Sequence, residues 1–345
     1  MNKVLFSILI ILFPGLIHAQ TGGNSTSSAL NLVSSARIAA SGGNMIAVKD
    51  ADPSLGIYNP SLLNKGMDNT FSLSYVNYFG DINYGFLSYV KHKDSLATFA
   101  ATFNYLNYGR FEERNEAGEK LGEFSAGDYV LNLSAGRQID SSFSIGANLK
   151  TIYSSYYTYN ALSMAVDVAG TYHKPGKGFT AALMMRNLGY NLKPMYTGNR
   201  ESLPFEVQFA ISQKLKHAPF RFHLAAENLQ KWDLSYVDPT LKPSIDPTTG
   251  QEIPVKTPGF GDRLMRHMVI GTELTTKNFF IGFGYNYRRR KELKVNEKGG
   301  LAGFSFGMGM KIKKFQLSYA LATYNQAGLS NHITLSFRLD DFKRN

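Results

Sequence analysis

Asn331-His332-Ile333-Thr334-Leu335-Ser336-Phe337-Arg338-Leu339 alternates apolar and polar side chains near the end of the chain. Because side chains alternate between the two faces of a strand, this stretch has one apolar and one polar face. Fourteen similar stretches run from about Thr70 to Leu339. A series of such segments, each about ten residues long and bounded by turn residues, is typical of an outer-membrane barrel. We therefore predict an all-β fold, a 14-stranded antiparallel transmembrane β-barrel with a short N-terminal helical hatch.

The connections between the predicted strands alternate between tight turns and long loops. The strands are expected near 70–79, 82–91, 95–107, 127–137, 143–153, 162–173, 178–188, 203–215, 219–229, 264–276, 278–288, 301–311, 314–323 and 331–339. The long loops are expected at 108–126, 189–202, 230–263 and 289–300. Outer-membrane barrels have short periplasmic turns and long outside loops. An even number of strands then predicts that both mature termini are periplasmic.

The two faces of the predicted strands differ in composition. Phenylalanine and leucine, such as Phe99, Leu131 and Phe306, occupy one parity, whereas glycine, serine and alanine occupy the other. Tyrosines on the apolar parity suit the headgroup depth of a membrane. The main alternative, a soluble β-sandwich, needs two apolar faces that meet each other, and the small polar face here does not provide one.

Several charged residues fall on the inward parity of neighbouring strands. We expect two lumen ion pairs, Lys150 with Asp167 and Glu206 with Arg221. Charges at membrane depth often mark a transport pathway, but matched pairs in a barrel also fill the lumen and hold an inserted segment. We favour the structural role for these pairs.

The N-terminal part of the chain lacks the alternating pattern that predicts strands. Residues 1–19 have the basic start, apolar run and small residue of a secretory signal peptide, cleaved after Ala19. Residues 20–68 form a polar tether and a hatch, 69–339 the barrel and 340–345 a C-terminal tail. Ala29 to Ala40 is expected to be briefly helical, and Asn59 followed by Pro60 is a good helix start.

Composition and motifs argue against soluble enzyme chemistry. The chain has no cysteine, and its net charge of +11 is scattered over turns rather than gathered on one helix, so we expect no nucleic-acid partner. Gly303-Phe304-Ser305-Phe306-Gly307 matches a nucleophile elbow but lies within a predicted strand. Asp50 and Asp52 near Asn59 fall short of a calcium loop. We expect no catalytic residue, no metal and no cofactor.

The longest predicted loop is rich in proline and begins with the only tryptophan. Trp232, Tyr236 and Phe260 are its candidate docking residues. A loop of this length in a barrel whose other connections are shorter indicates a function. Its composition leaves open whether it is a lid or a docking surface.

Two segments carry a resemblance to a known family. The first is Ser35-Ala36-Arg37-Ile38-Ala39-Ala40-Ser41-Gly42-Gly43-Asn44, followed by Asp50-Ala51-Asp52 and Tyr58-Asn59-Pro60-Ser61-Leu62-Leu63. The second runs from Leu317 through Gly328 to Phe337. Together they resemble the hatch and last hairpin of the PorV/PorQ group, whose barrels are similar to the FadL long-chain fatty-acid transporters. By this resemblance the hatch candidates are Arg37, Gly42, Gly43, Asn44, Asp52, Asn59 and Pro60.

The resemblance implies a part in the type IX secretion system of Bacteroidetes. It implies a non-enzymatic anchor in the outer membrane that works with PorU, PorV and PorZ, and that contacts outer-membrane lipid and lipopolysaccharide. The alternative is a FadL-like transporter of small hydrophobic molecules. Small or charged lumen positions favour docking over transport, because sites for apolar ligands are mostly hydrophobic.

Overall fold

A computed structural model describes residues 27–94, 96–196, 202–236, 243–245, 252–253, 257–293, 300–325 and 328–343. The predicted signal peptide 1–19 and the tether up to residue 26 lie outside the described residues.

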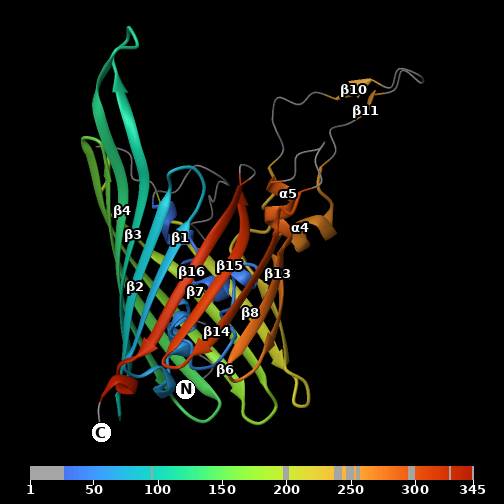
Figure 1. Cartoon of the computed structure of the whole chain (residues 1–345). Helices are drawn as coiled ribbons and strands as arrows, with labels where there is room; N and C mark the ends of the chain where they lie inside the picture. Colours follow the sequence, from blue (N-terminus) through green and yellow to red (C-terminus); the bar gives the residue numbers. More distant parts are fainter. Residues whose placement is uncertain are drawn as a thin grey trace, which may run out of the picture.

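The protein is a closed antiparallel barrel of 14 strands, as predicted (Figure 1). Its strands are β1 (Thr70–Asn77), β2 (Asn83–Lys93), β3 (Ala97–Arg114), β4 (Lys120–Gln138), β5 (Phe143–Tyr156), β6 (Tyr159–Lys174), β7 (Phe179–Lys193), β8 (Glu206–Lys214), β9 (Phe220–Ala226), β12 (Met268–Thr275), β13 (Phe279–Asn286), β14 (Phe304–Ile312), β15 (Phe315–Asn325) and β16 (Gly328–Arg338). β1 pairs with β16, with Leu73 opposite Leu335, and this pairing closes the wall. Among the described residues no helix has the length and apolar character needed to cross a membrane.

The predicted alternation sorts side chains between the outside and the lumen. Leu73, Leu87 and Phe99 leave 53%, 48% and 42% of their surface exposed on the outer face. Ser72 and Ser88, on the opposite parity, are each only 1% exposed. Since the exposed positions are large and apolar, the outer face is suited to hydrocarbon rather than water.

The predicted loop 108–126 is wrong, because β3 and β4 continue as one long hairpin beyond the neighbouring strands (Figure 1). Phe111 is paired with Phe124, and their rings stack with centroids 5.3 Å apart. At the tip the Asn115 side chain accepts hydrogen bonds from the backbone N–H groups of residues 117 and 119, and Gly118 has φ +83°. This turn chemistry closes the hairpin at a point that we assigned to a loop.

Two short helices replace the ends of two predicted strands. α4 (Phe260–Arg266) precedes β12, so the strand expected from 264 begins at Met268. α5 (Tyr287–Leu293) follows β13, so the strand expected to reach 288 ends at Asn286. The two helices pack together because the Asp262 carboxylate of α4 accepts a hydrogen bond from the Tyr287 hydroxyl of α5 at 2.8 Å and lies 3.0 Å from Lys291 Nζ. Within the predicted loop 230–263, β10 (Ser244–Ile245) pairs with β11 (Glu252–Ile253).

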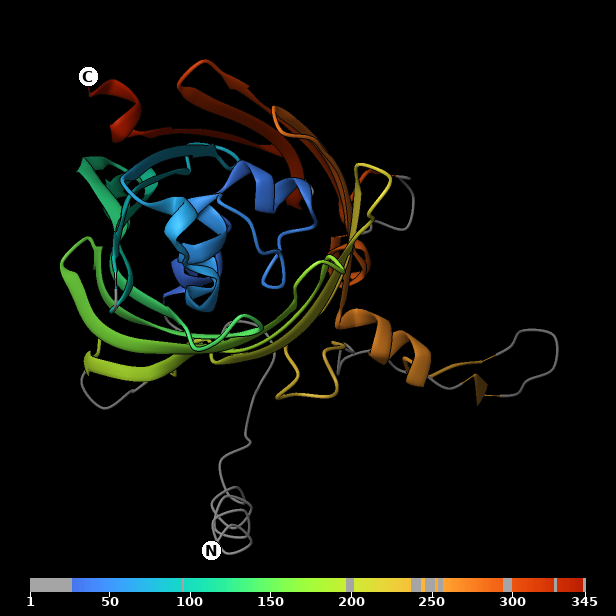
Figure 2. The same ribbon diagram turned by 90° about the horizontal axis from the view of Figure 1, so that it is seen from below.

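The segment before β1 lies inside the barrel, as the view along the lumen shows (Figure 2). It consists of η1 (Ser28–Asn31), α2 (Ala36–Ala40), α3 (Pro53–Tyr58), η2 (Pro60–Leu62) and η3 (Lys65–Met67). We call residues 27–67 the hatch. At the chain's other end η4 (Leu339–Phe342) lies on the side of the short turns (Figure 1).

The single helix expected from Ala29 to Ala40 is wrong. Leu32 is extended, with φ −74° and ψ 141°, and Ser35 before α2 is extended as well. The first free N–H of α2, that of Ala36, donates to the Thr334 hydroxyl of β16 at 3.0 Å. Contacts with the wall thus override the weak helical preference of the serine-rich segment.

Candidate functional site

The hatch is fixed to the wall by a buried cluster of charges around Arg37. α2 directs this side chain toward β12, where its Nε lies 2.6 Å from one oxygen of Glu273. Its other nitrogens lie 2.7 Å from Asp50 and 3.1 Å from Asp52, both in the hatch. The guanidinium also lies 5.2 Å above the Phe280 ring. Glu273 is fully buried, so this pairing replaces the water that a charge would otherwise need.

Arg221 joins the same cluster from β9. Its guanidinium lies 2.9 Å from Glu273 and 3.2 Å from Asp50. Burial opposes ionisation of Asp50, but Arg37 and Arg221 outweigh it and lower the pKa of Asp50 to about 2. We call Arg37, Asp50, Asp52, Arg221 and Glu273 the hatch lock.

A second set of polar contacts joins the hatch to β7, β8 and the chain after β9. The Asn44 amide donates to Gln208 at 3.1 Å and to Glu227 at 3.0 Å. Arg186 lies 4.7 Å above the Tyr58 ring and donates to the Tyr58 hydroxyl at 3.1 Å. Burial raises the pKa of Tyr58 to about 12, so its hydroxyl stays neutral.

One of the two predicted ion pairs forms and the other is wrong. Lys150 and Asp167 lie 2.6 Å apart inside the lumen, as predicted. Glu206 pairs instead with Arg186 at 3.6 Å, while Arg221 belongs to the hatch lock. The β8–β9 hairpin places Lys214 opposite Arg221, so Glu206 lies toward the other end of the strands. The predicted pair joined opposite charges on neighbouring strands, but it did not take into account how far each residue lies from the β8–β9 turn.

Glycines in the wall allow the backbone of the hatch to come close. A Cβ atom on Gly284 would lie 2.0 Å from the backbone nitrogen of Gly42, and one on Gly146 would lie 2.3 Å from the Pro60 carbonyl carbon. Both distances are far shorter than any real contact. Gly146 and Gly284 therefore leave the space that particular points of the hatch backbone occupy.

The remaining hatch candidates shape its turns. Gly42 and Gly43 have φ +86° and +95° and end α2, with the Gly43 N–H donating to the Ile38 carbonyl at 3.0 Å. The Asp52 side chain caps α3 and the Asn59 side chain caps η2, each accepting a backbone N–H at 3.0 Å. Pro60 occupies the first position of η2, as predicted.

The candidate docking residues lie outside the lumen. The Trp232 ring lies 5.3 Å from the Phe260 ring and stacks on the His267 ring at 5.8 Å. The candidates Trp232 and Phe260 therefore form one exposed aromatic cluster. Tyr236 is 75% exposed.

The sequence did not predict that Gln208 of the wall contacts Asn44 of the hatch, or that Tyr58 of the hatch contacts Arg186 of the wall. The inward parity of Gln208 indicated that its polar side chain faces the lumen, but parity does not identify the partner.

No candidate metal centre is present among the residues that the structure describes. The buried charges of the hatch lock, of Lys150 with Asp167 and of Arg186 with Glu206 are paired with one another, and this arrangement is suited to holding an inserted segment.

No protein-family model and no curated protein matches this chain. Among solved structures, the Pseudomonas putida toluene transporter TodX aligns with a TM-score of 0.54 at 12% identity, over 90% of this chain and 98% of that one. The Ralstonia pickettii toluene transporter TbuX aligns at 0.49 and 12% identity, over 88% and 98%. A Pseudomonas aeruginosa FadL homologue aligns at 0.46 and 11% identity, over 88% and 98%. The likeness to TodX shows the fold alone.

Proposed function

We propose that this protein is a non-enzymatic anchor and docking subunit of the attachment complex of the type IX secretion system, of the PorQ type. It is integral to the outer membrane with both mature termini in the periplasm. The observation that carries this proposal is the hatch lock, which holds the hatch across the lumen by buried ion pairs. A barrel closed in this way acts mainly through its outer surfaces.

Two exposed aromatic clusters at one end of the barrel support a docking role (Figure 1). The first is on the long β3–β4 hairpin, where Phe111 and Phe124 stack and Tyr157 lies 4.9 Å from Phe124. The second is formed by Trp232, which is 47% exposed, and Phe260, which is 70% exposed. Exposed aromatic side chains are enriched at the centres of protein interfaces.

The proposed partners follow the resemblance to the PorV/PorQ group. PorZ would bind the outside projections, PorU and PorV would complete the complex, and outer-membrane lipid and lipopolysaccharide would surround the barrel. The complex would receive exported proteins that carry a C-terminal signal domain.

The second candidate function is the passage of small hydrophobic molecules. The fold likeness favours this candidate, since TodX is a toluene transporter. The polar lumen favours docking, because Glu273, Lys150 and Asp167 are buried where an apolar ligand would pass.

Affinity purification of the full chain from outer membranes in mild detergent tests the two functions together. We expect stoichiometric recovery of a sortase-like peptidase and a large surface β-protein. Replacing Trp232 and Phe260 together by serine is expected to lower recovery of the surface protein at least tenfold. Phe342→Ser is the matched control, since this exposed aromatic residue lies at the opposite end. Recovery of the barrel alone, with a small apolar molecule bound in both forms, would overturn docking in favour of transport.

A further inference from the structure

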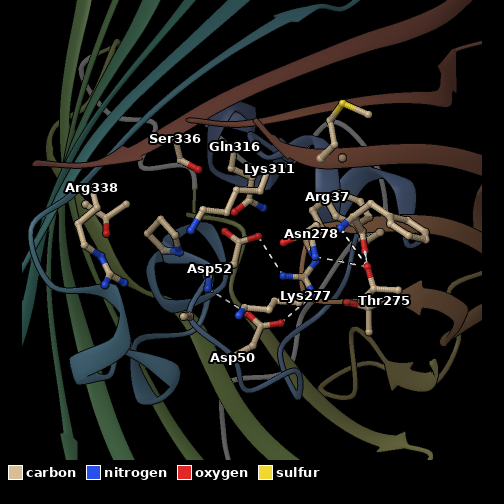
Figure 3. Close-up of a pocket in the computed structure, with 18 of the residues that line it drawn as sticks. Arg37, Asp50, Asp52, Thr275, Lys277, Asn278, Lys311, Gln316, Ser336 and Arg338 are labelled. Carbon is tan, nitrogen blue, oxygen red and sulfur yellow. Dashed lines mark hydrogen bonds and ion pairs between the residues drawn. The ribbon is translucent and has the colours of Figure 1, made fainter. Parts of the chain in front are cut away.

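A charged pocket opens where the hatch meets the ends of β8, β9 and β12 to β16 (Figure 3). Its volume is about 370 Å³. The hatch contributes the strap from Asp50 to Pro53, behind which lies the hatch lock. The opposite side is formed by the connections β12–β13 and β14–β15 and by the end of β16. The pocket therefore belongs to the short-turn end of the barrel, away from the two aromatic clusters.

The lining of this pocket is strongly cationic. Seven lysine and arginine side chains face three carboxylates. Two of the cations, Arg37 and Arg221, are already neutralised within the hatch lock. Within the described part of the chain Lys214, Lys277 and Lys311 have no ion-pair or side-chain hydrogen-bond partner. The pocket thus presents unpaired positive charge around the strap of the hatch.

The positions of Lys214 and Lys311 argue against the membrane as their partner. Lys214 and Lys311 continue the inward parity of Ser212 and Gly309, so they line the mouth of the lumen and not the lipid face. A lipid headgroup outside the wall cannot reach them, whereas a water-soluble anion can enter from the turn side. Positive side chains focused in a concave site attract such an anion.

The distribution of the charges fits a chain of anionic groups better than one small anion. The unpaired lysines come from three separate places, β8, the β12–β13 turn and the β14–β15 hairpin. A single phosphate is too small to meet all of these groups, whereas an acidic peptide can place successive carboxylates near them.

We propose that this pocket is a binding site for an acidic peptide segment of a soluble partner on the turn side of the barrel. Lys277 and Lys311 supply the main charge contacts, and the Asn278 amide offers hydrogen bonds. This inference is independent of the docking function proposed above, because it uses the other end of the molecule and needs no component of a secretion system.

Fluorescence anisotropy of a labelled hexaglutamate peptide with the full-length protein in a zwitterionic detergent tests the site. We expect saturable binding that weakens with added salt and that is absent for hexaglutamine. The double substitution Lys277→Gln and Lys311→Gln is expected to weaken binding about tenfold, because ion pairs at a partly exposed site contribute modestly.

The matched control is Lys174→Gln with Lys177→Gln, two lysines at the β6–β7 turn that lie outside the pocket. Unchanged binding in this control supports a specific pocket, and circular dichroism verifies that both double variants are folded. Equal loss in the two variants would show only a diffuse positive surface and would overturn the site. Competition by equimolar inorganic phosphate would show a small-anion site and would overturn the peptide assignment. No binding to the unaltered protein would overturn the proposal directly.

Discussion

At Gly284 the wall and the hatch approach so closely that one added methyl group decides whether they fit. In Gly284→Ala the new Cβ would meet the backbone of Gly42 at 2.0 Å, so we expect the local part of the hatch to be displaced. Overpacking of this kind costs about 1–3 kcal/mol. Thermal unfolding followed by circular dichroism should show a lower midpoint, and trypsin should gain access to Arg37. Gly170→Ala, which has open space at its Cβ, is the control, and equal behaviour of the two variants would contradict the close approach at Gly284.

Glu273 is the residue on which the hatch lock depends most. Glu273→Gln removes the carboxylate shared by Arg37 and Arg221, and it leaves two buried cations with less compensation. Breaking a buried pair from one side costs about 3–5 kcal/mol. Urea unfolding in detergent micelles should record the loss. Asp340→Asn, which breaks an exposed pair with Lys343, should leave the curve unchanged. A similar small effect of both changes would show that the lock contributes nothing.

Acid should release the hatch lock in a defined range of pH. The pKa of Asp50 is about 2 in the folded protein and lies near 4 in an unfolded chain, so its contribution is present above pH 4 and is lost as the pH falls toward 2. Ion conductance across a planar bilayer should therefore stay low from pH 7 to pH 4 and rise below that value. Asp50→Asn should show raised conductance already at pH 7. A flat profile down to pH 2 in the unaltered protein would contradict this role of Asp50.

Single residues were predictable to the extent that their chemistry is local. Asn59 and Pro60 form a cap whose two members are adjacent in sequence, and the structure places them so. Glu273 lies on the inward parity of its strand, but its partner Arg37 is 236 positions away. No local rule selects that partner among the inward charges.

Among the elements, the long β3–β4 hairpin extends the molecule beyond the barrel but adds little to its thermal stability. Beyond the pair Arg110–Ser125 its strands contact mainly each other, and ion pairs such as Lys120 with Glu112 at 3.2 Å are exposed. Exposed pairs contribute little. Replacing residues 111–124 by an Asn-Gly turn, which suits a two-residue hairpin, should leave the thermal midpoint unchanged. A clearly lower thermal midpoint in differential scanning calorimetry would show that the extension stabilises the wall.

The ends of the elements were harder to predict than their existence. The alternation around Phe111 continues into residues that are polar on both faces, so hydrophobic pattern alone did not separate strand from loop. The signal we overlooked was the turn sequence Asn115-Glu116-Ala117-Gly118. α5 was missed for a related reason, since a basic run at a strand end is compatible with either a loop or a short helix.

At the scale of the whole molecule, the hatch should decide whether the barrel conducts. The wall is closed by β1 and β16 without the hatch, so a chain lacking residues 27–64 is expected to form an open pore. Single-channel recording should show steps that the intact protein lacks. Equal conductance of the two forms would mean that the hatch does not seal the lumen, and heat-resistant migration in mild gels would verify that the shortened barrel is folded.

The architecture was predictable because the barrel repeats one simple rule fourteen times, and single errors at loop ends do not change the count. The fit of the hatch follows no repeated rule. It depends on which glycine lies opposite which backbone atom, and this follows from the register of the complete wall.

The position of the hatch at the start of the chain has a consequence for assembly. Ala36 is bonded to Thr334, 298 positions later, so the hatch reaches its final contacts only when the last strand is in place. Contacts so distant in sequence carry a large loop-closure cost and form slowly. The hatch and the last strand, β16, must therefore both be in place before this contact can form.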